Sequence, residues 1–293
     1  MTEIHLGSMS STTKATIVIP AHNEAAVIGR CLEGIYKTVE SGEFEVIVVC
    51  NGCTDNTAGI VAERFPLVKL LETPVASKVG ALNYADAEAG YFPRIYLDAD
   101  LSVSTDSLRD LIRPLQGVKA LASCGRMEIN ASRSNAAVRA FYRVWQYNSY
   151  FEQGKFGGLF AVSESGHARI SPFPDVLNDD ELVRRKFYST ERAFVESCSF
   201  KMTAPSTLDG LIKIRLRAIR GTVQLEKMGY ANGDGGSRQR LAKFISRILR
   251  KPTVWLSLPV YLLISIYIRC KGILSRPGKP GSWERDETSR EYA

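Results

Sequence analysis

Cysteine is sparse and scattered in this chain of 293 residues. The six cysteines include one Cys-x-x-Cys pattern, Cys50 to Cys53, and no second pair stands at the spacing of a zinc site. So few cysteines in so long a chain exclude a disulfide-stapled scaffold. Hydrophobic residues make up 45% of the chain, which is enough for a sizeable core. We therefore expect a cytoplasmic protein with reduced thiols and one large α/β domain.

Three other signatures are missing. Residues 1–13 contain no charged stretch followed by an apolar run, so we expect a disordered segment there and no secretory signal. The first predicted strand is followed by no Gly-x-Gly-x-x-Gly, and no P-loop pattern occurs, which argues against dinucleotide binding and P-loop phosphoryl transfer. The body has no basic stripe with interleaved aromatic residues, which argues against nucleic-acid binding.

Acidic residues are absent from 235 to 283, where ten lysines and arginines occur. The chain carries a net charge of +7, so the remainder is close to neutral. A basic end on a neutral body indicates contact with an anionic surface, such as a membrane.

Two apolar patterns occupy this basic end. Residues 237–250 show apolar side chains at helical spacing with basic side chains opposite, which predicts a cationic amphipathic helix. Residues 252–268 carry no charge; as one helix they would be about 25 Å long, at the short edge of a membrane span, with a kink at Pro259. We expect 238–271 to contact a membrane surface, and the alternative is that both helices pack on the catalytic domain.

Apolar runs alternate with helical patterns over the first hundred residues. Strands are expected at 15–20, 44–49, 68–72 and 94–97, and helices at 25–39, 56–65 and 78–89. The alternation predicts an α/β fold with a mostly parallel sheet flanked by helices. Ligands of such sheets bind at the carboxyl ends of the strands. The expected units are a disordered segment at 1–13, the α/β domain at 14–234, membrane-contacting helices at 235–274 and a disordered segment at 275–293.

Two carboxylates follow the fourth predicted strand. Asp98 and Asp100 are separated by one small residue, so they point to the same side if the extended geometry persists. Oxygen ligands of this kind suit Mg²⁺ or Mn²⁺ on a diphosphate, because these ions keep water and phosphate oxygens as their other ligands. A lone Asp-x-Asp is also common in solvated turns, so the neighbouring motifs decide between the two interpretations.

Further polar groups are expected near strand ends or helix starts. Asn23 is a candidate N-cap for the first helix. Asp179 and Asp180 open a short helix, where capping alone also favours carboxylates. Arg217 and Arg220 lie three apart and form a candidate anion clamp if helical.

Two more stretches are candidate ligand contacts. Gly157 and Gly158 open an apolar strand and would let the backbone approach a ligand closely. Residues 135–153 are rich in aromatic side chains and are expected to form a helix over the sheet or a wall for a ring-shaped acceptor.

In this order and spacing the motifs resemble those of the family 2 glycosyltransferases with the GT-A fold. The resemblance runs from about Ala15 to Arg220. Its motifs are Ile19-Pro20-Ala21-His22-Asn23-Glu24, the loop Asn51 to Thr57, Ser77-Lys78 with Ala81-Leu82-Asn83, Asp98-Ala99-Asp100, Gly157-Gly158 and Asp179-Asp180.

The resemblance implies a nucleotide-sugar donor, most often UDP-linked, a Mg²⁺ or Mn²⁺ cofactor, and inversion at the anomeric carbon. The residues that match donor-contacting positions of the family are Pro20, Ala21, Asn23, Glu24, Asn51, Lys78 and Asp98, with Arg217 and Arg220 as candidates for the diphosphate. Asp100 matches the metal ligand, with Asp98 beside it. Asp180 matches the catalytic base, and Asp179 precedes it where the family more often has glutamate.

The sequence departs from the family pattern at two places. The second strand ends in Cys50-Asn51-Gly52-Cys53 where the family commonly has Asp-Asp-Gly-Ser, so an amide replaces the aspartate that reads uracil. Arg217-Ala218-Ile219-Arg220-Gly221 lacks the tryptophan of the Gln-x-x-Arg-Trp signature of processive synthases. We therefore expect single addition of a sugar.

These features predict a metal-dependent hexosyltransferase that acts at the inner face of the cell membrane. Its acceptor would be a saccharide or a lipid-linked molecule, in glycan, glycolipid or polysaccharide biosynthesis. The alternatives are a nucleotidyltransferase on the same scaffold, a non-catalytic glycosyltransferase-like binding protein, or a transferase with a soluble small-molecule acceptor. A nucleotidyltransferase would need a glycine-rich basic loop after the first strand, and the sequence has no such loop.

Overall fold

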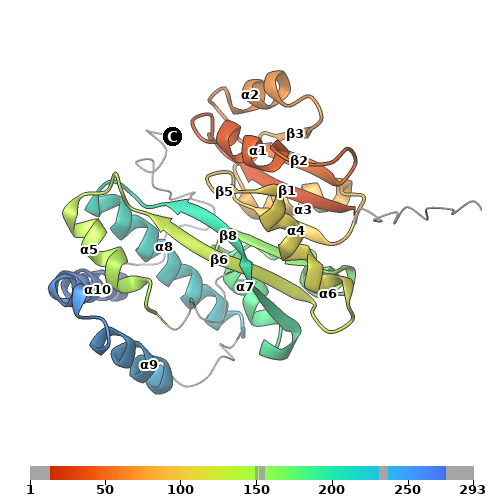
Figure 1. The fold of residues 1–293 in the computed structure, drawn as a ribbon. Coiled ribbons are helices and arrows are strands. Elements are labelled where there is room, and N and C mark those ends of the chain that lie inside the picture. The colour runs from red at the N-terminus through yellow and green to blue at the C-terminus, as the bar shows by residue number, and fades with distance from the viewer. Residues whose placement is uncertain (1–13, 149–150, 152–155, 231–236, 275–293) are drawn as a thin grey trace, which may run out of the picture.

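The structure is a computed structural model that describes residues 14–148, 151, 156–230 and 237–274 (Figure 1). The disorder expected at 1–13 and 275–293 falls outside these residues. An eight-stranded sheet forms the centre of the molecule, in the order β3-β2-β1-β4-β7-β6-β8-β5. The strands are β1 Ala15–Ala21, β2 Phe44–Asn51, β3 Lys69–Thr73, β4 Arg94–Leu97, β5 Ser102–Val103, β6 Ala122–Asn130, β7 Leu159–Val162 and β8 Arg192–Thr203.

The first four strands are parallel to one another, as βαβ connections require. β7 runs antiparallel to both β4 and β6, whereas β8 runs parallel to β6 and antiparallel to β5. The α-helices are α1 Ile28–Tyr36, α2 Thr57–Arg64, α3 Lys78–Glu88, α4 Thr105–Ile112, α5 Ala136–Trp145, α6 Glu164–Ile170, α7 Asp179–Lys186, α8 Leu208–Lys227, α9 Ser237–Leu249 and α10 Leu258–Leu274. Short 3₁₀ turns lie at η1 Arg113–Gln116, η3 Ser189–Glu191 and η4 Pro252–Ser257.

Helices cover both faces of the sheet. One buried cluster joins the sheet to α1, α2 and α4, and a second cluster on the opposite face joins it to α3, α6, α7 and α8. Every residue of β1 is buried, because side chains on both sides of this strand face helices. That double burial explains why β1 is a continuous apolar run and not an alternating one.

The predicted α/β fold with a mostly parallel sheet is confirmed, and the strand predicted at 94–97 is present as β4, whereas some local predictions are wrong. The extended geometry does not persist beyond Leu97, because Asp98 to Asp100 form a turn closed by a hydrogen bond from Leu101 N to Asp98 O of 3.1 Å. Asn23 does not cap α1, because its backbone is left-handed (φ 51°) and the helix starts at Ile28, with Val27 at the N-cap position. The helix expected over 135–153 ends at Trp145.

The long strand β8 was not expected from the sequence. Its pairing with β6 crosses a register shift between Gly125 and Arg126, and its burial follows no simple alternation. A local pattern could not reveal this strand, since its partner is distant in sequence.

The C-terminal helices fold back onto the catalytic domain and form one edge of the molecule (Figure 1). Pro259 lies in the first turn of α10 and does not kink it, because a proline at this position breaks no helical hydrogen bond. Among the residues that the structure describes, Pro252–Gly272 is long and apolar enough to cross a membrane by length and composition, with a mean hydropathy of 1.5.

Candidate active site

The loops after β1 and β2 are joined through Asn23. Its side-chain oxygen accepts hydrogen bonds from Thr54 N (2.6 Å) and Asp55 N (3.3 Å). Asparagine tolerates the left-handed backbone that this geometry needs. Glu24 is buried beside it, and its backbone N–H donates to Thr57 Oγ1 at 2.8 Å. The first predicted donor loop is therefore held in place by the loop at the end of the next strand.

Asn51 lies inside this junction and is fully buried. Its amide nitrogen donates to Ala21 O at 2.9 Å, and His22 Nδ1 lies 2.6 Å from Asn51 O. This buried amide joins β1 to β2. The structure therefore gives Asn51 a structural contact in place of the predicted contact with a donor base. The Cys53 thiol donates to Ala21 O at 3.4 Å, and Cys50 and Cys53 form no disulfide.

Gly158, directly before β7, shapes the Asp98–Asp100 turn. Asp98 N donates to Gly158 O at 2.8 Å. Gly158 has a φ of 80°, and a Cβ built on it would lie 2.9 Å from Asp98 Oδ2. Gly158 therefore leaves the space beside the Asp98 carboxylate open. Arg30 lies on the other side of the turn, with its guanidinium 3.5 Å from Asp100 O.

Lys78 joins the two acidic motifs. It is the first residue of α3, and its Nζ lies 2.7 Å from Asp98 Oδ1 and 3.0 Å from Asp179 Oδ2. The side chains of Lys78 and Asp179 are 15% and 6% exposed, so this bridge is largely shielded from water. Residues about one hundred positions apart thus meet in one site at the carboxyl edge of the sheet.

Burial and charge act together on these groups. Burial, and then repulsion from Asp179 and Asp100, raise the pKa of Asp98 to about 6 against the lowering effect of Lys78. Burial works to lower the pKa of Lys78, but Asp179 and Asp98 outweigh it and raise that pKa above its ordinary value. The crowded carboxylates therefore favour an additional cation.

Asp180 differs from Asp179 in its surroundings. Asp179 is buried against Lys78, whereas Asp180 is half-buried and its Oδ1 accepts a hydrogen bond from Glu181 N at 2.7 Å. Both belong to the first turn of α7, where the helix dipole favours negative charge.

α8 holds the segment that leads into α7. Asn178 Nδ2 donates to Ala218 O at 2.9 Å, and a Cβ on Gly221 would lie 2.3 Å from the Asn178 side chain. Arg217 reaches Leu177 O at 3.4 Å. The structure therefore brings Arg217 beside the acidic segment, with Arg220 on the same helix. The Asn178–Gly221 contact was not predicted, because it joins two segments that are distant in the chain and neither residue carries chemistry of its own.

A divalent metal fits these residues. Asp98 and Asp100 offer only oxygen ligands, and Gly158 leaves room beside Asp98. Among the described residues, no three His, Cys, Asp or Glu side chains gather in a complete metal cage. Such an incomplete set suits an ion that takes its other ligands from water and phosphate.

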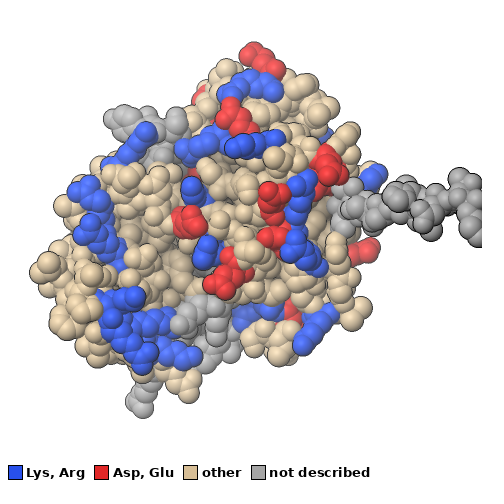
Figure 2. All heavy atoms as spheres, in the orientation of Figure 1, with Lys and Arg blue, Asp and Glu red and all other residues tan. Residues whose placement is uncertain are grey.

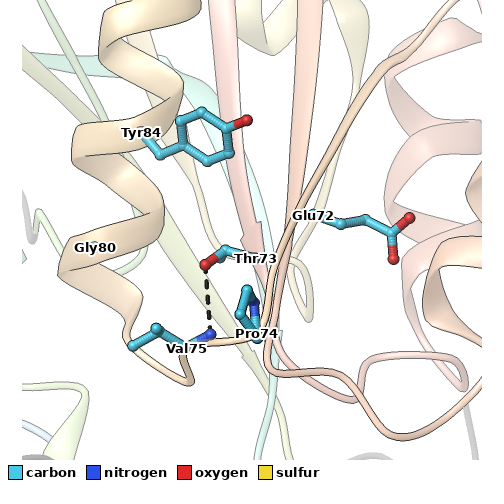
Figure 3. Close-up of a pocket in the computed structure, with 6 residues that line it drawn as sticks. All are labelled: Glu72, Thr73, Pro74, Val75, Gly80 and Tyr84. Carbon is cyan, nitrogen blue, oxygen red and sulfur yellow. Dashed lines mark hydrogen bonds between the residues drawn. The ribbon is translucent and has the colours of Figure 1, made fainter.

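A pocket of about 520 Å³ lies beside this site, at the end of β3 and the first turns of α3 (Figure 3). Its lining residues are Glu72, Thr73, Pro74, Val75, Gly80 and Tyr84. In Figure 3 the Glu72 side chain points away from Tyr84. Gly52 N donates to Thr73 O at 2.7 Å, so the pocket adjoins the loop after β2.

The sequence model of glycosyl transferase family 2 matches residues 16–171, more than half of the chain. The chain therefore belongs to glycosyl transferase family 2. It is also similar to the uncharacterized glycosyltransferase YibD of Escherichia coli, with 28% identity over 118 residues. That match covers 33% of this chain and 34% of the relative, so the chain spans about a third of the length of the curated relative.

Solved glycosyltransferase structures share the fold. The mannosyltransferase PcManGT from Pyrobaculum calidifontis, in complex with GDP-Man and Mn²⁺, aligns with a TM-score of 0.59 and 21% identity over 89% of this chain and 76% of its own. Glucosyl-3-phosphoglycerate synthase from Mycobacterium tuberculosis, in complex with Mn²⁺, UDP-glucose and phosphoglyceric acid, aligns with a TM-score of 0.54 and 17% identity over 75% of this chain and 81% of its own. At this identity the likeness shows the GT-A fold.

Replacement of Gly158 by alanine is expected to damage the site locally. The new Cβ would press on Asp98 Oδ2 in addition to the left-handed strain of about 1 kcal/mol. Gly229→Ala is the matched control, since Gly229 has a φ of 83° with open space around it. Differential scanning fluorimetry should show similar small losses of stability, with loss of the Mn²⁺-dependent stabilisation only in Gly158→Ala. Equal metal response in both variants would contradict the assignment.

Replacement of Lys78 by methionine is expected to cost about 2–4 kcal/mol at pH 7, because it leaves a buried carboxylate unpaired. Burial already raises the pKa of Asp98, and loss of the lowering effect of Lys78 raises it further, so part of the lost stability is regained as the pH falls through that pKa. Lys69→Met is the control, since Lys69 and Glu88 are both about 40% exposed and such pairs contribute about 0–1 kcal/mol. Urea unfolding at pH 7 and at a pH below the pKa of Asp98 measures the difference, and a pH-independent loss would show that the bridge is not ionic.

Proposed function

We propose that the protein transfers a single sugar from a UDP-linked donor to an acceptor hydroxyl, with inversion at the anomeric carbon. The observation that carries this proposal is the Lys78 bridge, which joins the Asp98 turn to the Asp179–Asp180 segment. One acidic motif would serve the donor diphosphate and the other the acceptor hydroxyl, so both must face the same space. Family membership and the GT-A fold support the same reaction class.

The donor side of the site is formed by the β1 and β2 loops and by the Asp98 turn. Pro20, Ala21, Asn23 and Glu24 would line the nucleotide, with Asp98 on its ribose or phosphate side. Asn51 is buried, so its contribution is to hold the two loops in register. Lys78 would hold the two carboxylates together and supply positive charge near the diphosphate.

Asp100, with Asp98, would hold Mg²⁺ or Mn²⁺. When bound, such an ion supplies positive charge that offsets the negative charge on the departing nucleoside diphosphate. Arg217 and Arg220 are the side chains of α8 proposed to assist with the same charge. Their helix contacts the segment before α7, which supports a position near both halves of the reaction.

The acceptor hydroxyl is a weak nucleophile at neutral pH, so a base must remove its proton as it attacks the sugar C1. Asp180 is the proposed base. An oxygen of Asp179 already pairs with Lys78, whereas Asp180 remains partly accessible at the start of α7. Asp179 would then position the segment, and Gly157 and Gly158 would border the acceptor.

The acceptor is proposed to be a saccharide or a lipid-linked molecule in glycan, glycolipid or polysaccharide biosynthesis, at the cytoplasmic face of the cell membrane. The exposed apolar side chains of 238–271, next to basic ones, support a membrane location.

A thermal-shift panel of UDP- and GDP-sugars, with and without Mn²⁺, tests the donor. We expect one UDP-sugar to raise the melting temperature in a metal-dependent way, because a ligand at about 100 times its Kd adds about 2.7 kcal/mol to the folded state. The free sugar and the nucleoside serve as controls. A metal-dependent shift with a GDP-sugar alone would replace the proposed nucleotide, and no shift with any of them would remove support for the transferase.

Asp180→Asn is expected to lower turnover by about 10²–10⁴-fold, because it removes the proton acceptor, with little change in donor affinity. Asp106→Asn is the control, since Asp106 also lies in the first turn of a helix but is 76% exposed and distant in the fold. Steady-state assays with the donor found above, together with calorimetric donor binding, measure both effects. Normal turnover in Asp180→Asn, with loss in Asp179→Asn at unchanged donor affinity, would move the base to Asp179.

A further inference from the structure

The C-terminal helices expose an unusual amount of apolar surface. More than half of the large apolar side chains that the described residues expose lie between 241 and 267. They are Leu241, Ile245 and Leu249 on α9, Trp255 and Leu256 on η4, and Leu262, Leu263, Ile266 and Tyr267 on α10. We call these nine side chains the α9–α10 face. Such a concentration marks an interaction surface.

The opposite side of α10 is fixed to the catalytic domain. Ile264 and Ile268 are 8% and 3% exposed and pack with α5 and α8. The Tyr261 and Phe141 rings lie 5.2 Å apart, and a Cβ on Gly272 would lie 3.5 Å from Ile219. The contact therefore extends over most of the helix. A membrane-spanning orientation would have to break it, so α10 must meet a bilayer with its outer side only.

α9 and η4 are anchored in the same way. Ile248 and Val254 are buried with Val144 of α5, and the Phe244 and Tyr261 rings lie 5.8 Å apart. Arg247 donates to Tyr147 O at 3.0 Å. These inward contacts leave Leu241, Ile245 and Leu249 as an i, i+4, i+8 row on the outside of α9.

Charge identifies the partner. Lys243, Arg250, Lys251, Arg269 and Lys271 are exposed on these elements, and the chain has no acidic residue from 235 to 283. Figure 2 shows Lys and Arg side chains gathered over α9, with no Asp or Glu among them on this side. Two copies of the chain meeting through this face would bring like charges together, whereas anionic lipid headgroups complement them. Trp255 and Tyr267 belong to the residue types that favour the headgroup level.

We propose that the α9–α10 face lies in the plane of an anionic bilayer, with α9, η4 and α10 half-immersed and α10 not spanning it. The inference rests on the membrane location proposed for the transferase, but donor binding and turnover play no part in its test. Length does not decide the orientation, because Pro252–Gly272 is long enough to cross a membrane. The inner side of α10 packs on α5 and α8, and an in-plane helix keeps that contact while its outer side enters the bilayer.

Co-sedimentation of the full chain with vesicles tests the partner. We expect binding to phosphatidylcholine vesicles that contain about a third phosphatidylglycerol, weaker binding to phosphatidylcholine alone, and a loss at high salt. The double variant Leu256→Glu, Leu263→Glu should bind at least about tenfold more weakly. The control Leu67→Glu, Val118→Glu changes side chains that are 82% and 101% exposed elsewhere, and it should bind like the parent.

Two further measurements decide the orientation. An alkaline carbonate wash should release the bound protein, and an environment-sensitive dye on the exposed Cys270 should shift to the blue on vesicles. Retention after the wash would show a spanning helix and overturn the in-plane arrangement. No vesicle binding, or dimerisation through the same leucines in sedimentation velocity, would overturn the bilayer as partner. Donor thermal shifts measured without vesicles report on the transferase separately.

Discussion

The Lys78 bridge is the interaction on which the candidate site depends. One ammonium group holds Asp98, which follows β4, against Asp179, which starts α7. Without it, two carboxylates would face each other in a place with little water, and their repulsion would separate the donor turn from the acidic segment. The bridge therefore holds the two segments together and offsets part of the negative charge of the site.

Glycine and asparagine residues allow the other close contacts between the loops of the site. Gly158 keeps space open next to Asp98, and Gly221 lets Asn178 reach α8. Asn23 adopts a left-handed backbone and links the loops after β1 and β2. In each case a small side chain or a short amide allows close approach of two segments, so the site is assembled by contacts between loops on a rigid sheet.

The C-terminal helices α9 and α10 pack on the domain with one side and are exposed on the other. Their inner faces complete an apolar cluster with α5 and α8, while their outer faces remain apolar and basic. The same residues therefore stabilise the domain and offer a surface to a partner. The packing on the domain that was one of the two interpretations of this segment is therefore present, and membrane contact stays a prediction.

The sequence by itself determined the parallel part of the sheet, β1 to β4, because doubly buried strands must be continuously apolar and the helices between them must show one apolar face. It also determined which strand ends carry polar groups. Only the tertiary structure decided how these groups meet. Partners distant in sequence decide the turn at Asp98, the burial of Asn51, the pairing of β8 with β6 and the different burial of Asp179 and Asp180. Local periodicity cannot encode such contacts, since it records which side of an element is apolar and not which element lies against it.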